Sequence, residues 1–315
     1  MTECERIISQ GILPPEFFRE ETRSDFFVST ERKKIWAVEL DVLLEFDRVC
    51  RKHGLKYFLC GGSLLGAVRH KGFIPWDDDV DVGMLREDYE EFLKLADEFK
   101  HPYFLQTPYT DPGNFWSFAK IRNNNTSCIS GAFVFSEISA GIPIDVFPYD
   151  KVSLDDFEEN YSKTRELILL NSTYMRINNP YLKDTPRVKA YPGGDPMERY
   201  EEIQRIAMKH QHEDTGYISL AVATIYDSSK NLYRYEDFTS LCSVEFEGYT
   251  FPAMAGYDHV LRVNFGDYMQ YPPVEERGTW HYGAIFNPDV PYKDLLEKYR
   301  SAPWPENSMT KPLIV

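Results

Sequence analysis

Four aspartates fall within five consecutive positions of the sequence WDDDVD, residues 76–81. Asp79 and Asp81 alternate with Val80 and Val82, which is the periodicity of a strand with one acidic and one apolar face. Two residues apart on a strand, the two carboxylates point the same way and lie about 6.5–7 Å apart. Because such carboxylates repel each other unless a cation lies between them, and because all-oxygen ligands favour hard cations, the spacing predicts a site for Mg²⁺ or Mn²⁺.

A third acid stands alone in an apolar stretch further along the chain. Asp145 lies in the sequence GIPIDVFP, residues 141–148, which has the pattern of a strand. A carboxylate among apolar residues needs a partner, and a strand beside Asp79 and Asp81 would give it the same cation. We therefore expect Asp79, Asp81 and Asp145 to be the metal ligands and catalytic residues. Asp145 would either complete the metal site or accept the proton of an attacking hydroxyl.

The roles of Asp77 and Asp78 are less defined by the pattern. They would either support the metal ligands or bind the headgroup of a donor substrate. The alternative for the whole acidic run is a solvated turn without a cation, and the strict alternation of acidic and apolar residues argues against it.

The turn Gly61-Gly62-Ser63 follows an apolar stretch and leads into a short helical pattern. Backbone N–H groups in such a turn are open to a phosphate, so we expect it to bind the substrate. A tight turn without a ligand is the alternative. The remaining candidates for substrate contacts are cationic or aromatic: Arg69, His70, Lys71, Trp76, Lys120, Arg122 and His281. Lys120 in particular needs an anionic partner on an otherwise apolar strand, and Trp76 or Trp116 would suit a quaternary ammonium group.

The elements that position these residues follow from periodicity and from glycine and proline. Apolar residues at helical spacing predict a helix over 30–53 that ends at Gly54, and further helices over 63–69, with Ser63 as its cap, and 86–99. Strands are expected at 56–60, 79–84, 103–106, 116–122, 132–137 and 142–147. This mixture favours an α+β fold with a mixed sheet flanked by helices.

The second half of the chain has a different pattern of expected helices, strands and loops. Helices are expected at 154–175, 197–213 and 257–265, with a proline- and glycine-rich loop near 176–196 and a hairpin over 243–252 that turns at Glu247-Gly248. We therefore divide the chain into an irregular N-terminal arm (1–29), a catalytic core (30–150) and a mainly helical C-terminal region (151–315). The last of these would complete the core and the acceptor site.

Composition limits the partners and the compartment. The chain of 315 residues has 35 basic and 50 acidic residues, a net charge of −15, which disfavours nucleic acid and anionic membranes at long range. Its five cysteines have no metal-ligand spacing, so we expect reduced, packed thiols. Neither a signal sequence nor a long apolar stretch is recognisable, so we expect a soluble, cytoplasmic protein that contacts a membrane surface only transiently.

The stretch YFLCGGSLLGAVRHKGFIPWDDDVDVGMLREDYEEF, residues 57–92, resembles the signature of the LicD family of phosphocholine transferases, to which fukutin-related proteins are also similar. Further matching stretches are FAKIRNNNTS (118–127), GIPIDVFPYD (141–150), VEFEGYTFPA (244–253) and FGDYMQYPPVEERG (265–278). The resemblance extends over most of the chain from about 30 to 285. Departures from the family pattern are Ser63, where Thr is common, and Phe265, where Tyr often stands.

The resemblance implies a nucleotidyltransferase-like fold with helical and loop insertions in the C-terminal half. The Gly61-Gly62-Ser63 turn, Asp79, Asp81 and Asp145 fall at matching positions. The implied reaction transfers phosphocholine, or a related ribitol, glycerol or ethanolamine phosphate, from a CDP-choline-like donor to a hydroxyl of a glycan or glycolipid precursor. Two other functions remain open: a nucleotidyltransferase that releases pyrophosphate, and a catalytically silent binding protein.

Overall fold

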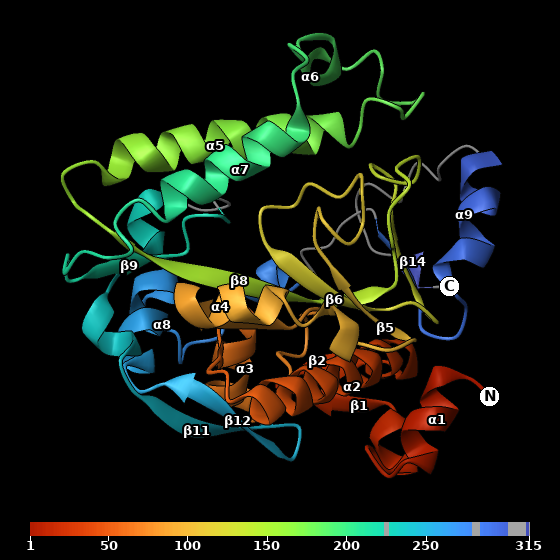
Figure 1. Ribbon diagram of the computed structural model, residues 1–315. Helices are drawn as coiled ribbons and strands as arrows, with labels where there is room; N and C mark the ends of the chain where they lie inside the picture. The colour runs from red at the N-terminus through yellow and green to blue at the C-terminus, as the bar shows by residue number, and fades with distance from the viewer. Residues whose placement is uncertain (224–226, 279–283, 302–312, 315) are drawn as a thin grey trace.

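A computed structural model describes residues 1–223, 227–278, 284–301 and 313–314 of the chain. Its centre is a mixed seven-stranded sheet built around the long strand β8 (Ile142–Val152), as Figure 1 shows. One edge of β8 pairs with β4 (Asp81–Leu85) in parallel, and the other edge pairs antiparallel first with β6 (Ala119–Asn123) and then with β9 (Tyr217–Ser219). The remaining members of this sheet are β3 (Phe58–Leu59), β5 (Tyr103–Gln106) and β10 (Leu232–Arg234).

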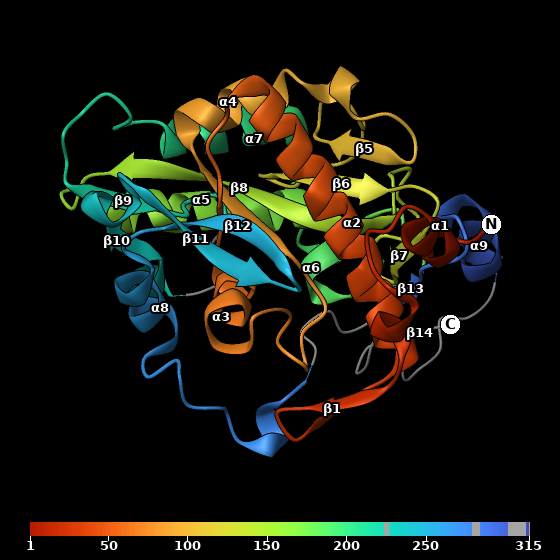
Figure 2. The same ribbon diagram turned by 90° about the horizontal axis from the view of Figure 1, so that it is seen from below.

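Helices cover both sides of this sheet. Helices α5 (Phe157–Tyr174) and α7 (Pro196–Ala207) lie on one side of β8, and α2 (Thr30–His53) and α3 (Gly61–His70) lie on the other, as Figures 1 and 2 show together. The expected mixed sheet flanked by helices is confirmed. The other described helices are α1 (Glu3–Ser9), α4 (Arg86–Leu93), α6 (Pro186–Lys189), α8 (Tyr257–Phe265) and α9 (Tyr292–Ser301).

Smaller sheets complete the architecture. The hairpin of β11 (Leu241–Phe246) and β12 (Tyr249–Met254) covers the α3 side in Figure 2, and it turns at Glu247-Gly248 as the sequence predicts. The other small sheets are the hairpin of β1 (Glu21–Arg23) and β2 (Phe26–Val28) and a sheet of β7 (Ser127–Ser130), β13 (Ala284–Asn287) and β14 (Leu313–Ile314). Beyond residue 150, helices therefore alternate with strands, and β9 and β10 join the central sheet.

Helix α2 occupies the residues that the periodicity predicts. Its N-cap Ser29 accepts a hydrogen bond from the backbone N–H of Arg32 at 3.3 Å, and it ends at Gly54, whose φ of 68° is left-handed. The apolar stripe with Val38, Val42 and Phe46 is fully buried. Strand β5 and helix α8 also have their expected bounds.

Several expectations about individual elements are wrong. The helix expected over 197–213 ends early, at Ala207. Residues 132–137 form turns rather than a strand, because the strand in this region, β7, is selected by its long-range pairing with β13. The helix expected over 86–99 ends at Leu93, and a separate 3₁₀ turn follows at Ala96–Glu98. The N-terminal arm, expected to be irregular, contains α1 and the β1–β2 hairpin.

Two differences change the site directly. Helix α3 begins at Gly61 with Cys60 as its N-cap, so Ser63 lies inside the helix and does not cap it. Strand β4 begins at Asp81, two residues later than predicted, so Asp79 lies in the loop before the strand. The acidic run therefore follows a loop path whose direction periodicity could not predict.

Candidate metal and phosphate site

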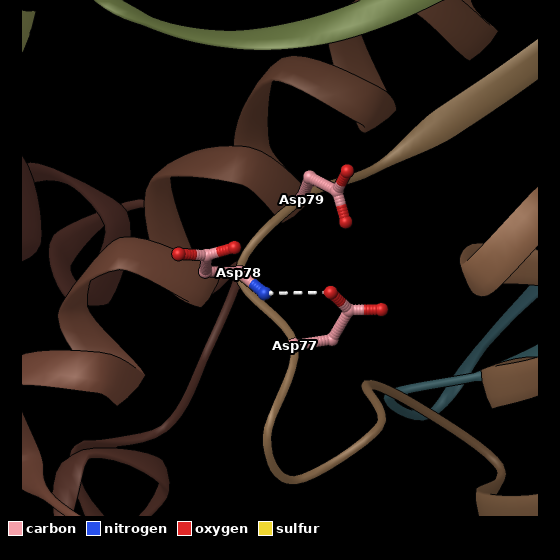
Figure 3. A group of neighbouring side chains, drawn as sticks. All are labelled: Asp77, Asp78 and Asp79. Atoms are coloured by element: carbon pink, nitrogen blue, oxygen red, sulfur yellow. Dashed lines mark hydrogen bonds between the residues drawn. The ribbon is translucent and has the colours of Figure 1, made fainter. Parts of the chain in front are cut away.

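Asp77, Asp78 and Asp79 form a carboxylate cluster at the end of the loop between α3 and β4. One carboxylate oxygen from each lies within 4.8 Å of the others. Figure 3 shows Asp77 and Asp79 on one side of the loop and the Asp78 carboxylate on the other, with the Asp78 backbone N–H donating to Asp77 Oδ1 at 3.2 Å. Asp78 is buried, whereas Asp77 and Asp79 are partly exposed. This cluster could hold a metal ion, and its oxygen-only donor set fits a hard divalent cation.

Helix α2 fixes the loop through the backbone of Asp77. The Asp77 carbonyl accepts hydrogen bonds from Arg32 Nη1 at 2.7 Å and from Trp36 Nε1 at 3.0 Å. Trp36 is fully buried, and its ring stacks on Phe73 with centroids 4.8 Å apart. A rigid, buried anchor of this kind holds the three carboxylates close together in spite of their mutual repulsion.

The two glycines at the start of α3 leave room for two of the acids. A Cβ at Gly61 would lie 3.0 Å from Asp81 Oδ2, and a Cβ at Gly62 would lie 2.7 Å from Asp77 Oδ2. Gly61 also has a positive φ of 52°. The Ser63 hydroxyl accepts the Asp81 backbone N–H at 2.8 Å. The residues expected to cradle a phosphate are thus placed directly beside the acidic loop.

Asp81, Asp145 and Lys120 form a row across three neighbouring strands. Asp81 and Asp145 are register partners in the parallel pair β4 and β8, and Asp145 and Lys120 are partners in the antiparallel pair β8 and β6. Lys120 Nζ forms an ion pair with Asp145 Oδ1 at 2.5 Å. The prediction that Lys120 needs an anionic partner is confirmed. Asp81 and Asp145 are not members of the three-aspartate cluster found among the described residues, which shares only Asp79 with the predicted ligand set.

One buried acid near the cluster was not predicted from the sequence. Glu39 lies on α2 with only 1% of its surface exposed, and neither of its carboxylate oxygens has a hydrogen-bond partner within the described parts of the chain. Burial, together with the negative charges of Asp78, Asp79 and Asp77, raises the pKa of Glu39 well above its ordinary value. The sequence feature that could have identified Glu39 is a charged residue within the apolar face of the predicted helix over 30–53.

A group of cations and aromatic rings borders the acidic loop. The guanidinium carbon of Arg277 lies 5.0 Å from the centroid of the Trp76 ring and 5.5 Å from that of Tyr271. The guanidinium of Arg69 lies 5.9 Å and 5.1 Å from the same two centroids. Burial and the charge of Arg277 lower the pKa of Arg69. In the described residues, neither guanidinium forms an ion pair with a carboxylate, and both donate to backbone carbonyls.

His70 belongs to the same group. Its ring stacks on Tyr271 with centroids 5.4 Å apart, and Arg69 Nε donates to its Nε2 at 2.9 Å. Burial and the positive charges of Arg69 and Arg23 lower the pKa of His70 to about 4. His70 is therefore neutral at pH 7 and accepts the Arg69 hydrogen bond. Tyr271 and Arg277 were not singled out from the sequence, although both lie in a stretch with family resemblance.

The remaining candidates for substrate contacts lie apart from this group or outside the residues that the structure describes. Arg122 is buried, and it donates to Gln106 Oε1 at 2.5 Å and to the Gly141 carbonyl at 2.6 Å. Lys71 is exposed at the end of α3, where its carbonyl accepts the Glu247 backbone N–H at 2.8 Å. His281 lies outside the described residues. Trp116 is half-buried, with Lys120 Nζ 5.6 Å from its ring centroid.

Comparisons with known proteins agree with the resemblance found in the sequence. Residues 54–189 match the family model for the nucleotidyltransferase domain of LicD, FKTN and FKRP proteins. The lipopolysaccharide cholinephosphotransferase LicD of Haemophilus influenzae is 28% identical over 250 residues, which cover 77% of this chain and 92% of that protein. The ribitol 5-phosphate transferase FKRP of Homo sapiens is 63% identical over 35 residues, 11% of this chain and 7% of that protein. The Rickettsia typhi protein RT0683 is 49% identical over 71 residues, 22% of each chain.

Within residues 1–223, 227–278, 284–301 and 313–314, no helix combines the length and apolar character needed to cross a bilayer.

Proposed function

Since the chain belongs, through residues 54–189, to the LicD/FKTN/FKRP nucleotidyltransferase domain family, we propose that it is a cation-dependent phospho-alcohol transferase. It transfers phosphocholine, or a related phospho-alcohol, from a CDP-activated donor to a hydroxyl of a cell-surface glycan or glycolipid precursor. The similarity to a lipopolysaccharide cholinephosphotransferase of Haemophilus influenzae supports phosphocholine, and the similarity to the ribitol 5-phosphate transferase FKRP supports a ribitol phosphate.

One observation carries this proposal: a cluster of carboxylates directly follows Trp76 in the chain, and two guanidinium groups lie against the Trp76 ring. Trp76 directly precedes Asp77, and its ring contacts both Arg69 and Arg277. A diphosphate donor needs both kinds of group, because its phosphates bind guanidinium groups and share a divalent cation with carboxylates. Two adjacent cations without a carboxylate partner in the described residues are unusual in a chain of net charge −15, and they suit an anionic ligand.

Asp77, Asp78 and Asp79 would hold the cation, Mg²⁺ or Mn²⁺, in this proposal. When bound, it supplies neutralisation of the charge that develops on the transferring phosphoryl group and on the leaving nucleotide. Arg69 and Arg277 bind the donor phosphates and orient them toward the acidic loop. Neutral His70 accepts a hydrogen bond from Arg69 and so helps to keep its guanidinium in place.

Asp145 is proposed to act on the acceptor. Its ion pair with Lys120 fixes its carboxylate beside Asp81, and it is not part of the three-aspartate cluster. Asp145 accepts the proton of the acceptor hydroxyl while the hydroxyl oxygen forms a bond to phosphorus. The bond between that phosphorus and the CMP oxygen breaks, and CMP leaves. We assign the acceptor contacts to the region after residue 150, and we expect the protein to act in the cytoplasm.

The experiment is an assay of CMP release from CDP-choline, CDP-ribitol, CDP-glycerol and CDP-ethanolamine, with Mg²⁺ or with EDTA, and with lipopolysaccharide or teichoic acid fragments as acceptors. The proposal expects Mg²⁺-dependent CMP release with one donor and a phospho-alcohol on the acceptor. Release of pyrophosphate from CTP, with a nucleoside monophosphate attached to the acceptor, would instead identify a nucleotidyltransferase.

A further inference from the structure

Glu39 shares one face of helix α2 with the two residues that anchor the acidic loop. Arg32, Trp36 and Glu39 are separated by four and three residues, which places them in line along the helix. Arg32 and Trp36 both donate to the Asp77 carbonyl, and Glu39 follows one turn later. The negative charges of Asp78, Asp79 and Asp77 contribute to the raised pKa of Glu39, so these acids lie near it, but Glu39 is not within 4.8 Å of all three carboxylates.

The described residues around Glu39 provide no hydrogen-bond donor for its buried carboxylate. It is 1% exposed, and within the described residues both of its oxygens are without a hydrogen-bond donor. Asp41, another acid on the same helix, is 2% exposed, yet it pairs with Arg6 and accepts a hydrogen bond from Tyr103 at 2.9 Å. Buried polar atoms nearly always have partners, so the orphaned oxygens of Glu39 indicate that a partner is missing.

We infer that Glu39 is a ligand of the divalent cation, which it contacts from the protein interior while Asp77, Asp78 and Asp79 contact it from the loop. This inference rests on the cation site of the proposed function and adds a helix-borne ligand to it. A cation there gives Glu39 its partner and relieves the repulsion among four carboxylates. Because α2 is rigid and also fixes the loop, the helix and the loop together would set the size of the site.

The test is the affinity for Mn²⁺ alone, without nucleotide, measured by calorimetry on the full chain. The variant is Glu39→Gln, which resembles a neutral glutamic acid in shape but cannot ligate as a carboxylate. We expect Glu39→Gln to bind Mn²⁺ at least about tenfold more weakly, within the range for lost metal-site groups. The matched control is Asp41→Asn, which alters a buried acid two residues away and should leave the Mn²⁺ affinity within about twofold of wild type.

A Glu39→Gln variant that folds and binds Mn²⁺ within about twofold of wild type would overturn the inference, because Glu39 would then be a neutral structural residue. If that variant fails to fold, infrared spectra of the wild-type chain with ¹³C-labelled glutamate decide. The other three acids of the cation site are aspartates, so Mn²⁺ should shift a glutamate carboxylate band only if Glu39 is a ligand, and an unchanged spectrum overturns the inference.

This outcome is independent of the donor and acceptor. If Asp79→Asn abolishes Mn²⁺ binding while Glu39→Gln does not, the cation site of the proposed function stands and Glu39 is excluded from it. If no CDP donor is turned over but both variants weaken Mn²⁺ binding, Glu39 stands as a ligand and the proposed reaction fails.

Discussion

Lys120 and Asp145 face each other across the antiparallel strands β6 and β8 and form an ion pair with 2.5 Å between Nζ and Oδ1. The pair fixes the only acidic side chain in the apolar strand segment 142–148. Asp81 lies beside Asp145 on the other edge of β8, so a cation and an anion flank the same carboxylate. The ion pair with Lys120 fixes the position of the Asp145 carboxylate, and its proposed role as a proton acceptor depends on that position.

The first prediction follows from the role proposed for Asp145. Asp145→Asn should lower kcat about 100-fold or more, the usual cost of losing a general base, while leaving Mn²⁺ affinity within about twofold. Steady-state CMP release and calorimetry measure the two quantities. A large loss of Mn²⁺ affinity would mean that Asp145 is a metal ligand instead.

Asp79 is the residue common to the predicted ligand set and to the observed cluster. Asp79→Asn should weaken Mn²⁺ binding at least about tenfold and reduce CMP release in proportion at low Mn²⁺. Asp97→Asn, at an exposed position, is the control and should change neither quantity. Full activity of the Asp79 variant at low Mn²⁺ would contradict the metal assignment.

Arg277 is predicted to bind the donor phosphates. Arg277→Gln should raise KM for the CDP donor about tenfold, because a lost charge-assisted hydrogen bond costs about 1.5–3 kcal/mol. The change in kcat should be smaller. Arg262→Gln provides the comparison, since Arg262 is exposed and pairs with Asp258. An unchanged KM in the Arg277 variant would remove this residue from the donor site.

His70 should make stability depend on pH. Its pKa is about 4 in the folded protein, below the ordinary value of 6.5, so the unfolded chain binds more protons between these values. The wild type should therefore lose stability as the pH falls from about 6.5 toward 4. His70→Gln should lose less over the same range. Urea unfolding of both proteins at several pH values measures the difference, and parallel curves would argue against a depressed pKa.

Arg86 and Asp150 form a pair that supports the fold rather than the chemistry. Arg86 Nε and Nη2 donate to the two Asp150 oxygens at 2.6 and 2.7 Å, and both side chains are almost completely buried. Arg86→Met should lower the free energy of unfolding by about 3–5 kcal/mol, because it leaves Asp150 buried without this partner. Arg205→Met, at an exposed pair with Glu202, should leave the free energy of unfolding nearly unchanged. Chemical denaturation compares the two.

Local pattern was sufficient for most of the elements around the site. The bounds of α2, its stop at Gly54 and the hairpin turn at Glu247-Gly248 depend on side-chain periodicity and on the backbone freedom of glycine, which act over a few residues. The apolar pattern around Asp145 likewise indicated a strand. Local pattern did not predict strand β7, because the bounds of this strand depend on its long-range pairing with β13.

The sequence by itself provided an acidic run, the isolated acid Asp145 and the strand patterns around them, from which we predicted a cation site. Only the tertiary structure decided which acids meet. Asp77, Asp78 and Asp79 cluster because Arg32 and Trp36, some 40 residues earlier, fix the loop through one carbonyl. Glu39 and Arg277 approach the acidic loop from distant segments, because proximity across a core depends on packing and not on distance along the chain.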